Sequence, residues 1–177
     1  PAAPTLDDDA LDAANARLEG ADAETVIAWA AETFGKGLVM SSSFGAHSAV
    51  MLHLVHRVVP ELPILFIDTG YLFPETYRFA DELVERLQLN LQVFRPLVSR
   101  AWMEARHGRL WEQNLDDIQR YNRLRKVEPM RRALDELSVR TWIAGLRRDQ
   151  SGERAQRQFL ELNNGRWKLH PLLDWST

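Results

Sequence analysis

The sequence predicts an α/β fold in which a parallel twisted sheet carries flanking helices. Two short apolar runs, Leu38–Met40 and Ile64–Ile67, are typical of strands that are buried on both faces. Segments with helical spacing follow both runs, and short loops connect them. Such strand–helix repeats favour parallel strands with right-handed crossovers. We expect one α/β domain over residues 1–177, with residues 1–20 loosely ordered.

The composition favours a cytoplasmic protein without a membrane anchor. Hydrophobic residues make up 45% of the chain, and no apolar run approaches the roughly 20 residues of a membrane span. The N-terminal stretch lacks a signal-peptide pattern. The 177 residues contain no cysteine, which excludes disulfides, thiolate metal sites and cysteine nucleophiles among them. We predict no metal site, because metal-ligand spacing with acidic residues is absent at His53, His56, His107 and His170.

The net charge of −3 hides an uneven distribution of charge along the chain. Residues 1–35 hold eight acidic residues and one basic residue, whereas residues 120–157 hold eleven basic and five acidic residues. A local excess of positive charge indicates an anionic ligand, and a solvated basic helix face is the alternative. The sequence pI of 6.0 and the absence of a recognition module argue against nucleic acid as the partner.

Two N-terminal helices are expected to serve packing. The first covers Leu11–Leu18, and the second covers Ala23–Phe34 with Asp22 as its N-cap. The Gly35-Lys36-Gly37 segment then ends the second helix.

A polar loop follows the first strand. Three serine hydroxyls and Gly45, which lets a ligand approach the backbone, precede a helix over residues 46–59. We expect Val50, Leu54 and Val58 to form its buried stripe. A helix start offers unpaired N–H groups and a positive dipole end to an anion. We therefore predict a phosphate site at this loop, with an ordinary polar turn as the alternative.

A second polar turn, Asp68–Tyr71, follows the second strand. Pro74 suits the first turn of the next helix, and Glu75 complements the dipole of that helix. Right-handed crossovers put this turn and the 41–45 loop on the same sheet edge, where ligands bind in open parallel sheets. We expect the two loops to share a nucleotide-sized pocket.

Residues 99–138 are predicted to be helical after a third strand over Leu91–Phe94. We expect five apolar side chains of this region to pack rather than bind a ligand: Trp102, Leu110, Trp111, Leu115 and Ile118. Pro129 is expected near a helix N-terminus, with Arg123 and Lys126 just before it. These two basic residues either reach an anion or are solvated.

A basic loop, Gly145–Arg154, follows a fourth strand over Thr141–Ala144. It contains three arginines together with Gln150 and Ser151, and arginine forks match phosphate or sulfate oxygens. In the alternative, acidic residues of the same loop neutralise these arginines. Further on, Asn164-Gly165 predicts a hairpin with a primed turn.

Four blocks carry a resemblance to a known family: Ser41–Gly45, Asp68–Tyr77, Lys126–Met130 and Gly145–Ser151. From about residue 25 onward, the chain resembles the 3′-phosphoadenylyl sulfate (PAPS) reductases of assimilatory sulfate reduction. The resemblance implies an adenine-nucleotide α-hydrolase-like fold, related to the PP-loop ATP pyrophosphatases. It implies PAPS as substrate, with sulfite and adenosine 3′,5′-bisphosphate as products.

The resemblance also implies the residues of the substrate site. The first block would line the phosphosulfate and ribose site, and the second would help form the nucleotide pocket. Lys126 and the arginine loop would contact substrate anions. The substrate-binding residues expected in this way are Ser41, Ser42, Ser43, Phe44, Gly45, Ser48, Asp68, Thr69, Gly70, Phe73, Glu75, Thr76, Lys126, Gly145, Arg147, Arg148, Gln150, Ser151 and Arg154.

The resemblance further implies how the substrate is reduced. Relatives that reduce adenylyl sulfate carry a Cys-Cys pair and a 4Fe-4S cluster, but this chain has Tyr121-Asn122 at those positions. We therefore expect the cluster-free branch, with no bound cofactor and with thioredoxin or glutaredoxin as the external reductant. The nucleophile of the family is a cysteine in a C-terminal Glu-Cys-Gly-Leu-His segment. We expect this cysteine in a tail that the 177 residues do not include.

Two other functions are considered. A non-catalytic adenine-nucleotide binding module would account directly for the absence of cysteine. A PP-loop ATP pyrophosphatase is the less favoured alternative, because such loops read Ser-Gly-Gly-x-Asp-Ser and this chain has His47 at the acidic position. His47 itself is either a phosphate donor or a helix-surface residue. A homodimer is the assembly that we consider for the chain.

Overall fold

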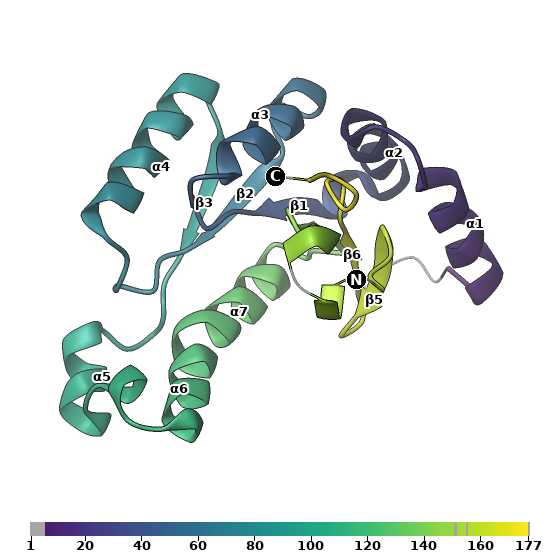
Figure 1. Cartoon of the computed structure of the whole chain (residues 1–177). Coiled ribbons are helices and arrows are strands. Elements are labelled where there is room, and N and C mark those ends of the chain that lie inside the picture. The colour runs from purple at the N-terminus through teal and green to yellow at the C-terminus, as the bar shows by residue number, and fades with distance from the viewer. Residues whose placement is uncertain (1–5, 151, 155, 177) are drawn as a thin grey trace.

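The computed structural model describes residues 6–150, 152–154 and 156–176, apart from the side chains of Gln150 and Glu153. Its centre is a six-stranded sheet in the order β3-β2-β1-β4-β6-β5 (Figure 1). The strands are β1 (Leu38–Ser41), β2 (Pro63–Ile67), β3 (Asn90–Phe94), β4 (Thr141–Ile143), β5 (Leu160–Asn163) and β6 (Arg166–Leu169). Every neighbouring pair is parallel except β5 and β6, which form an antiparallel hairpin. The predicted α/β class is confirmed.

Helices cover both faces of the sheet. In the described ranges they are α1 (Asp8–Leu18), α2 (Ala23–Phe34), α3 (Ser48–Val58), α4 (Pro74–Leu87), α5 (Arg100–His107), α6 (Leu115–Asn122) and α7 (Glu128–Glu136). Because side chains alternate along a strand, β1 serves two cores. Leu38 and Met40 join the core under α2 and α3, whereas Val39 packs with Ala133 and Leu134 of α7. None of these helices is long and apolar enough to cross a membrane.

Helix α1 lies within residues 1–20, the segment that we expected to be loosely ordered. Helix α1 begins at Asp8, and the side chain of Asp7 accepts a hydrogen bond from the N–H of Ala10 at 2.8 Å. Asn15 fixes this helix to β5, because its amide donates to the Leu160 carbonyl at 3.0 Å and accepts from the Leu160 N–H at 2.9 Å. Residues 8–18 are therefore docked on the edge strand of the sheet.

The predicted buried stripe of α3 is only partly confirmed: Leu54 and Val58 are half-buried against the core, but Val50 is not. Val50 is 46% exposed, whereas Met51, Leu52 and Val55 are buried against the sheet. Apolar residues occupy most sides of this helix, so helical spacing alone does not select the side that faces the core.

Helices α5 and α6 form an arm that projects away from the sheet (Figure 1). Three apolar residues that we expected to pack are exposed on it: Trp102, Leu115 and Ile118. Only Leu110 of that group is fully buried, at 1% exposure. An arm without a sheet beneath it has one face to bury, so apolar residues on its other faces stay in solvent.

The chain continues from α6 into α7 without a break, which corrects the expected helix start before Pro129. A π-helical turn, Arg123–Val127, joins the two helices, and the N–H of Glu128 donates to the Arg123 carbonyl. Pro129 has no N–H to donate, which fits a widened turn directly before it. Lys126 therefore lies inside a continuous helix and not in front of a free N-terminus.

The β5–β6 hairpin has the predicted primed turn. Asn164 and Gly165 have φ angles of 50° and 76°, as the primed geometry requires at both central positions.

Candidate functional site

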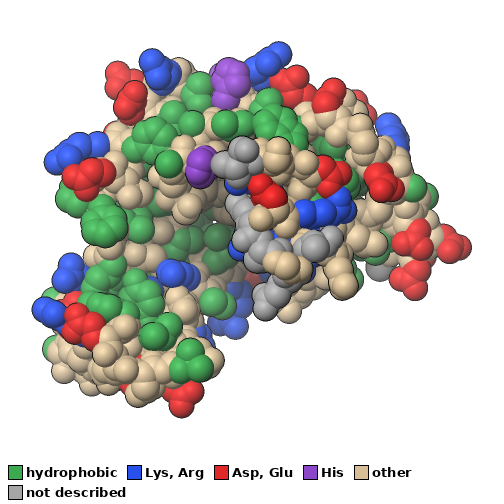
Figure 2. Space-filling model, viewed as in Figure 1, with side chains coloured by type: hydrophobic (Ala, Val, Ile, Leu, Met, Phe, Trp, Pro, Cys, Tyr) green, Lys and Arg blue, Asp and Glu red, His purple; other side chains and the backbone are tan. Residues whose placement is uncertain are grey.

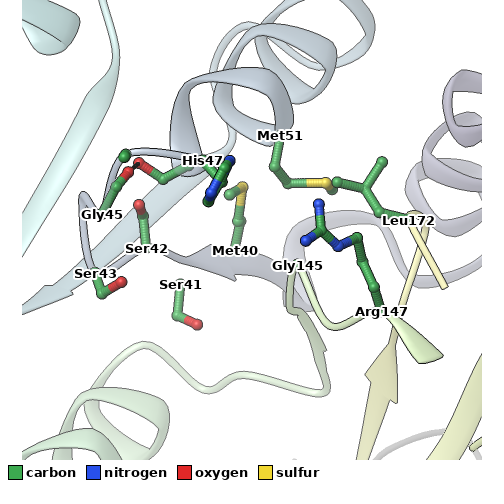
Figure 3. A pocket seen from close by; sticks show the side chains of 12 residues that line it. Met40, Ser41, Ser42, Ser43, Gly45, His47, Met51, Gly145, Arg147 and Leu172 are labelled. Atoms are coloured by element: carbon green, nitrogen blue, oxygen red, sulfur yellow. Dashed lines mark hydrogen bonds between the residues drawn. The ribbon is translucent and has the colours of Figure 1, made fainter. Parts of the chain in front are cut away.

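A cavity of about 260 Å³ opens at the carboxyl ends of β1 and β4 (Figure 3). Its lining comes from the end of β1 and the loop after it, the start of α3, the loop after β4 and the segment after β6. The lining residues are Met40, Ser41, Ser42, Ser43, Gly45, Ala46, His47, Ser48, Met51, Gly145, Arg147 and Leu172. On the molecular surface, a hollow lies between the α5–α6 arm and the rest of the protein, with Lys and Arg side chains along it (Figure 2).

The loop after β1 is held by a buried phenylalanine. Phe44 has a φ of 50°, in the left-handed region that costs energy for a residue with a side chain. Its ring is only 2% exposed and packs edge-on against Phe66 at 5.1 Å. Its N–H donates to the Ser42 hydroxyl at 3.1 Å. The strained position of the loop is therefore Phe44 rather than Gly45, and burial of the ring holds the loop in shape.

The start of α3 faces the cavity without a capping side chain. Ser48 donates to the Gly45 carbonyl from its N–H at 2.9 Å and from its hydroxyl at 2.6 Å. His47 occupies the N-cap position, and its side chain makes no capping hydrogen bond. Asp, Ser or Asn side chains cap the starts of α1, α2, α5 and α6. The positive end of the α3 dipole therefore lies at the cavity wall, where it favours an anion.

Arg147 brings a positive charge to the same cavity. Its guanidinium points toward Met51 and Met40 across the cavity from the serines (Figure 3). Its Nε lies 3.3 Å from a carboxylate oxygen of Asp149, so part of this charge is balanced within the loop. The sequence left open whether this loop binds an anion or neutralises itself, and the structure shows an arginine that lines the cavity while it is paired.

Arg148 and Arg154 of the same loop do not line this cavity. Arg148 forms an ion pair with Asp174, and its guanidinium also donates to the Arg157 carbonyl at 2.9 Å and 3.2 Å. Arg154 is half-buried in a short 3₁₀ turn. The predicted ligand contacts of Gln150 and Ser151 stay predictions, because the Gln150 side chain and the whole of Ser151 lie outside the described residues.

The Asp68 turn lies at the same sheet edge but is occupied with internal contacts. One oxygen of the Asp68 carboxylate accepts from the Tyr77 hydroxyl at 2.6 Å and the Gly70 N–H at 2.9 Å. The other accepts from Arg95 at 2.9 Å. Burial raises the pKa of Asp68, but these hydrogen bonds outweigh burial and hold that pKa below its ordinary value. Asp68 thus shapes its own loop and does not line the cavity.

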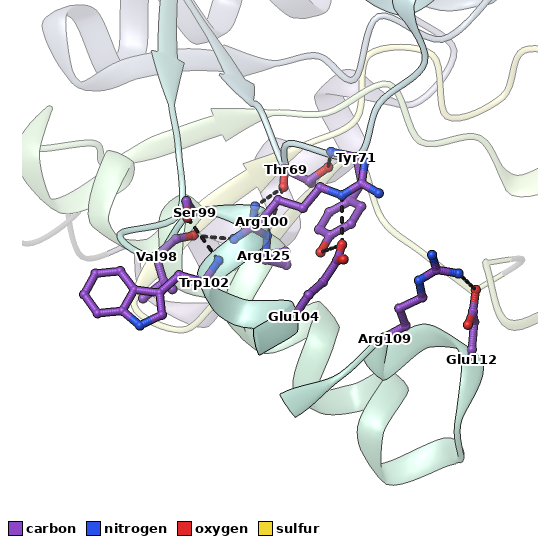
Figure 4. A network of polar contacts seen from close by, with 10 residues as sticks. All are labelled: Thr69, Tyr71, Val98, Ser99, Arg100, Trp102, Glu104, Arg109, Glu112 and Arg125. Atoms are coloured by element: carbon purple, nitrogen blue, oxygen red, sulfur yellow. Dashed lines mark hydrogen bonds and ion pairs between the residues drawn. The ribbon is translucent and has the colours of Figure 1, made fainter. Parts of the chain in front are cut away.

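No local pattern in the sequence predicts the buried arginine that supports this turn. Arg125 is 3% exposed, and its guanidinium donates to the carbonyls of Thr69 and Val98 (Figure 4). Gly70 has a φ of 75°, and a Cβ built there would lie 2.9 Å from Nη2 of Arg125. Glycine at position 70 is therefore needed for both its backbone angle and this close approach.

The remaining predicted residues lie apart from the cavity. Phe73 is 75% exposed, Glu75 pairs with Arg78 at the surface, and Thr76 is half-buried in the first turn of α4. Lys126 lines a different cavity, on the face of the sheet that α7 covers. Among the described residues, no group of three or more His, Asp or Glu side chains is placed to hold a metal ion.

An aromatic cluster occupies the position where the resemblance led us to look for a cysteine pair. Tyr121 packs against Tyr71 and Trp111, with ring centres 5.6 Å away in both cases. Burial, followed by the hydrogen bond to Glu104, raises the pKa of Tyr71 to about 12, so its hydroxyl stays protonated. The cluster joins the arm to the Asp68 turn.

Comparison with known proteins identifies the family. A family model described as "Phosphoadenosine phosphosulfate reductase domain" matches residues 37–177. The chain belongs to this family. A phosphoadenosine 5′-phosphosulfate reductase from Xanthomonas campestris pv. campestris (strain B100) is 62% identical over 175 residues, which cover 99% of this chain and 72% of that relative. The resemblance that the sequence blocks indicated is confirmed.

Solved structures agree with this assignment. The phosphoadenylyl-sulfate reductase of Candida auris, solved as a phosphate complex, aligns with a TM-score of 0.84 and 30% identity over 98% of this chain and 83% of that chain. An FMN adenylyltransferase of Candida glabrata aligns with a TM-score of 0.58 and 16% identity over 97% of this chain and 56% of that chain, a likeness of fold alone. The predicted adenine-nucleotide α-hydrolase-like (PP-loop) fold is confirmed.

Proposed function

We propose that this chain binds 3′-phosphoadenylyl sulfate with the phosphosulfate group in the cavity between β1 and α3. One observation carries the proposal: the serine hydroxyls, the uncapped start of α3 and Arg147 meet at a single cavity. Hydroxyl donors, a helix dipole and a guanidinium all favour an oxyanion. The phosphate held by the relative from Candida auris supports the same ligand chemistry.

The site would then serve reduction of the substrate to sulfite and adenosine 3′,5′-bisphosphate. A cysteine thiolate attacks the sulfonyl sulfur, an S–S bond forms, and the S–O bond to the 5′-phosphate breaks. The electron pair of that bond leaves on the bisphosphate. A second thiol then attacks the S-sulfonated cysteine, which releases sulfite and leaves a disulfide. None of the 177 residues is a cysteine, so we propose that both thiols come from outside them.

The finer assignment to the cluster-free branch has its own support. The aromatic packing of Tyr121 leaves a phenol ring where a cluster-bearing relative would place a thiolate. Without a cluster, the two electrons for sulfite come from a dithiol, and we propose thioredoxin or glutaredoxin as that partner. In this reaction this chain binds the substrate, aligns its sulfur and balances the charge of the leaving phosphate.

Titration calorimetry with adenosine 3′,5′-bisphosphate tests the substrate site. Arg147→Gln keeps a hydrogen-bonding side chain and removes the charge, so we expect affinity to fall about tenfold or more. Arg86→Gln is the control, because Arg86 is an exposed residue of α4 paired with Glu82. Equal affinity in the wild type and Arg147→Gln would contradict the proposed placement of the phosphosulfate group.

A thiol titration separates the reductase from the non-catalytic binding module. We expect the protein isolated from its own cells to carry a reactive thiol that becomes S-sulfonated on incubation with PAPS. We expect the 177-residue chain to bind the bisphosphate without becoming sulfonated, because it has no thiol. Bisphosphate binding without any sulfonated thiol in the native protein would favour the binding module instead.

A further inference from the structure

A second cavity lies on the opposite side of the sheet from α3. It is larger than the first, at about 740 Å³, and it opens between α7 and the β5–β6 hairpin. The π-helical turn before α7 and the central residue of β4 complete its walls. The lining residues are Lys126, Val127, Met130, Arg131, Leu134, Asp135, Trp142, Asn163, Asn164, Arg166, Trp167 and Lys168.

Positive charge dominates this basic cavity. Four basic side chains line it against one carboxylate, that of Asp135. Arg166 pairs with Asp135 at 2.5 Å and also donates to the Val139 carbonyl at 3.0 Å. Lys126, Arg131 and Lys168 therefore remain as positive charges in excess of the acidic lining. The amide groups of Asn163 and Asn164 add neutral hydrogen-bond donors from the hairpin.

Lys168 lies against the indole ring of Trp142 in the cavity wall. Its Nζ lies 4.6 Å from the centre of the Trp142 ring. Burial lowers the pKa of Lys168, and the nearby charge of Arg157 lowers it further. Glu161, its partner across the hairpin, opposes this effect only in part. An anion in the cavity would favour the charged form of Lys168, which burial opposes.

We propose that the basic cavity binds a phosphate or sulfate group of a small molecule. Three basic side chains in excess, two amides and an indole wall give the charge and the donors that a doubly charged oxyanion requires. The group could belong to a nucleotide whose other end occupies the first cavity, or to a separate oxyanion. Both sources share the same chemistry.

Trp142 connects the two cavities. Its ring lines the basic cavity, and its indole N–H donates to the hydroxyl of Ser41, which lines the first cavity, at 2.6 Å. Binding beside the ring changes the surroundings of an indole that also touches the first site. Trp142 fluorescence therefore responds to occupancy of either cavity, and Trp142→Phe separates its signal from that of Trp167, which also lines the basic cavity.

The test is a titration with inorganic phosphate, in which calorimetry and tryptophan fluorescence measure the binding. Arg131→Gln and Lys168→Met each remove one charge from the basic cavity, and Arg131 is exposed, so that variant is expected to fold. Arg86→Gln and Lys36→Met are matched controls outside both cavities. We expect two phosphates per chain, and about threefold to tenfold weaker binding of one of them in each cavity variant.

The two sources are separated by competition. If adenosine 3′,5′-bisphosphate displaces both phosphates and adenosine 5′-monophosphate displaces one, the second group is part of the nucleotide. If phosphate still binds to the bisphosphate-saturated protein and Lys168→Met weakens it, the ligand is a separate oxyanion. The proposal is overturned if Arg131→Gln and Lys168→Met bind phosphate as the wild type does. Arg147→Gln tests the first cavity independently, so failure of one site is distinguishable from failure of the other.

Discussion

The indole N–H of Trp142 donates a hydrogen bond of 2.6 Å to the hydroxyl of Ser41, across the pair of strands β4 and β1. A serine hydroxyl has one proton, and an oxygen that already accepts from an indole directs that proton elsewhere. Because Ser41 lines the first cavity, its proton is available to a ligand oxygen there. Trp142 thus acts as a positioning residue for Ser41.

Trp142→Phe is expected to weaken binding of adenosine 3′,5′-bisphosphate about threefold to tenfold, because Ser41 loses its fixed orientation. The free energy of unfolding should fall by about 1 kcal/mol from the lost hydrogen bond. Calorimetry and urea denaturation measure the two effects. Trp175→Phe, at an exposed tryptophan away from the cavity lining, should leave the affinity unchanged. Unchanged affinity in Trp142→Phe would contradict the positioning role of Trp142.

Gly70→Ala and Gly20→Ala form a matched pair for the Asp68 turn. The φ angles are 75° and 74°, so both variants should lose about 1 kcal/mol from left-handed strain. Only at position 70 does the new Cβ meet another group, Nη2 of Arg125 at 2.9 Å. That contact displaces a hydrogen-bonded guanidinium, so we expect Gly70→Ala to lose about 1–2 kcal/mol more in urea denaturation. Equal losses of unfolding free energy in the two variants would show that the Arg125 side chain moves away from the new Cβ without a cost.

Arg125→Met tests the buried arginine itself. Its removal leaves the Thr69 and Val98 carbonyls without the donors that they have now, so we expect a loss of about 2–4 kcal/mol in the free energy of unfolding. Arg123→Met, on the same π-helical turn but exposed, should change that energy by less than about 0.5 kcal/mol. Urea denaturation measures the free energy of unfolding of both variants. Similar losses in the two would contradict a supporting role for Arg125.

His170 makes stability depend on pH. The side chain is fully buried, and burial, followed by the charge of Lys168, lowers its pKa to about 4. The unfolded chain, with an ordinary histidine pKa of about 6.5, takes up the proton first as pH falls. Stability is therefore full above about pH 6.5 and declines toward pH 4, by about 3 kcal/mol from this group.

His170→Gln should flatten the stability profile between these pH values, whereas His53→Gln, at an exposed position, should leave the slope unchanged. Urea denaturation at half-unit pH intervals measures the slope for each protein. The same slope in His170→Gln and the wild type would assign the pH dependence to other groups.

The motifs at the sheet edge were predictable because short loops and right-handed crossovers determine where parallel strands end. Residues 41–43 and 45–48 line one cavity together with Gly145 and Arg147. Which of the loops line the cavity and which make internal contacts was not predictable. Asp68 is engaged by Tyr77 and Arg95, and these partners follow from long-range packing that no local pattern records.

Two further features lay beyond sequence reasoning. Arg125 is one of many arginines in a basic run, and only the π-helical turn directs it into the interior. The sequence predicts Trp142 only as part of a strand, because its hydrogen bond to Ser41 depends on the pairing of β4 with β1. The glycine in the Asp68–Tyr71 turn is the one sequence signal that is consistent with a close neighbour at this position.

A crystal structure of the chain with adenosine 3′,5′-bisphosphate tests the central claim most directly. We expect the 5′-phosphate within hydrogen-bond distance of the loop over residues 41–48, with the Arg147 guanidinium against its oxygens. The claim would be contradicted by a bisphosphate whose 5′-phosphate lies outside this cavity, with the loop and Arg147 in the arrangement they have without ligand.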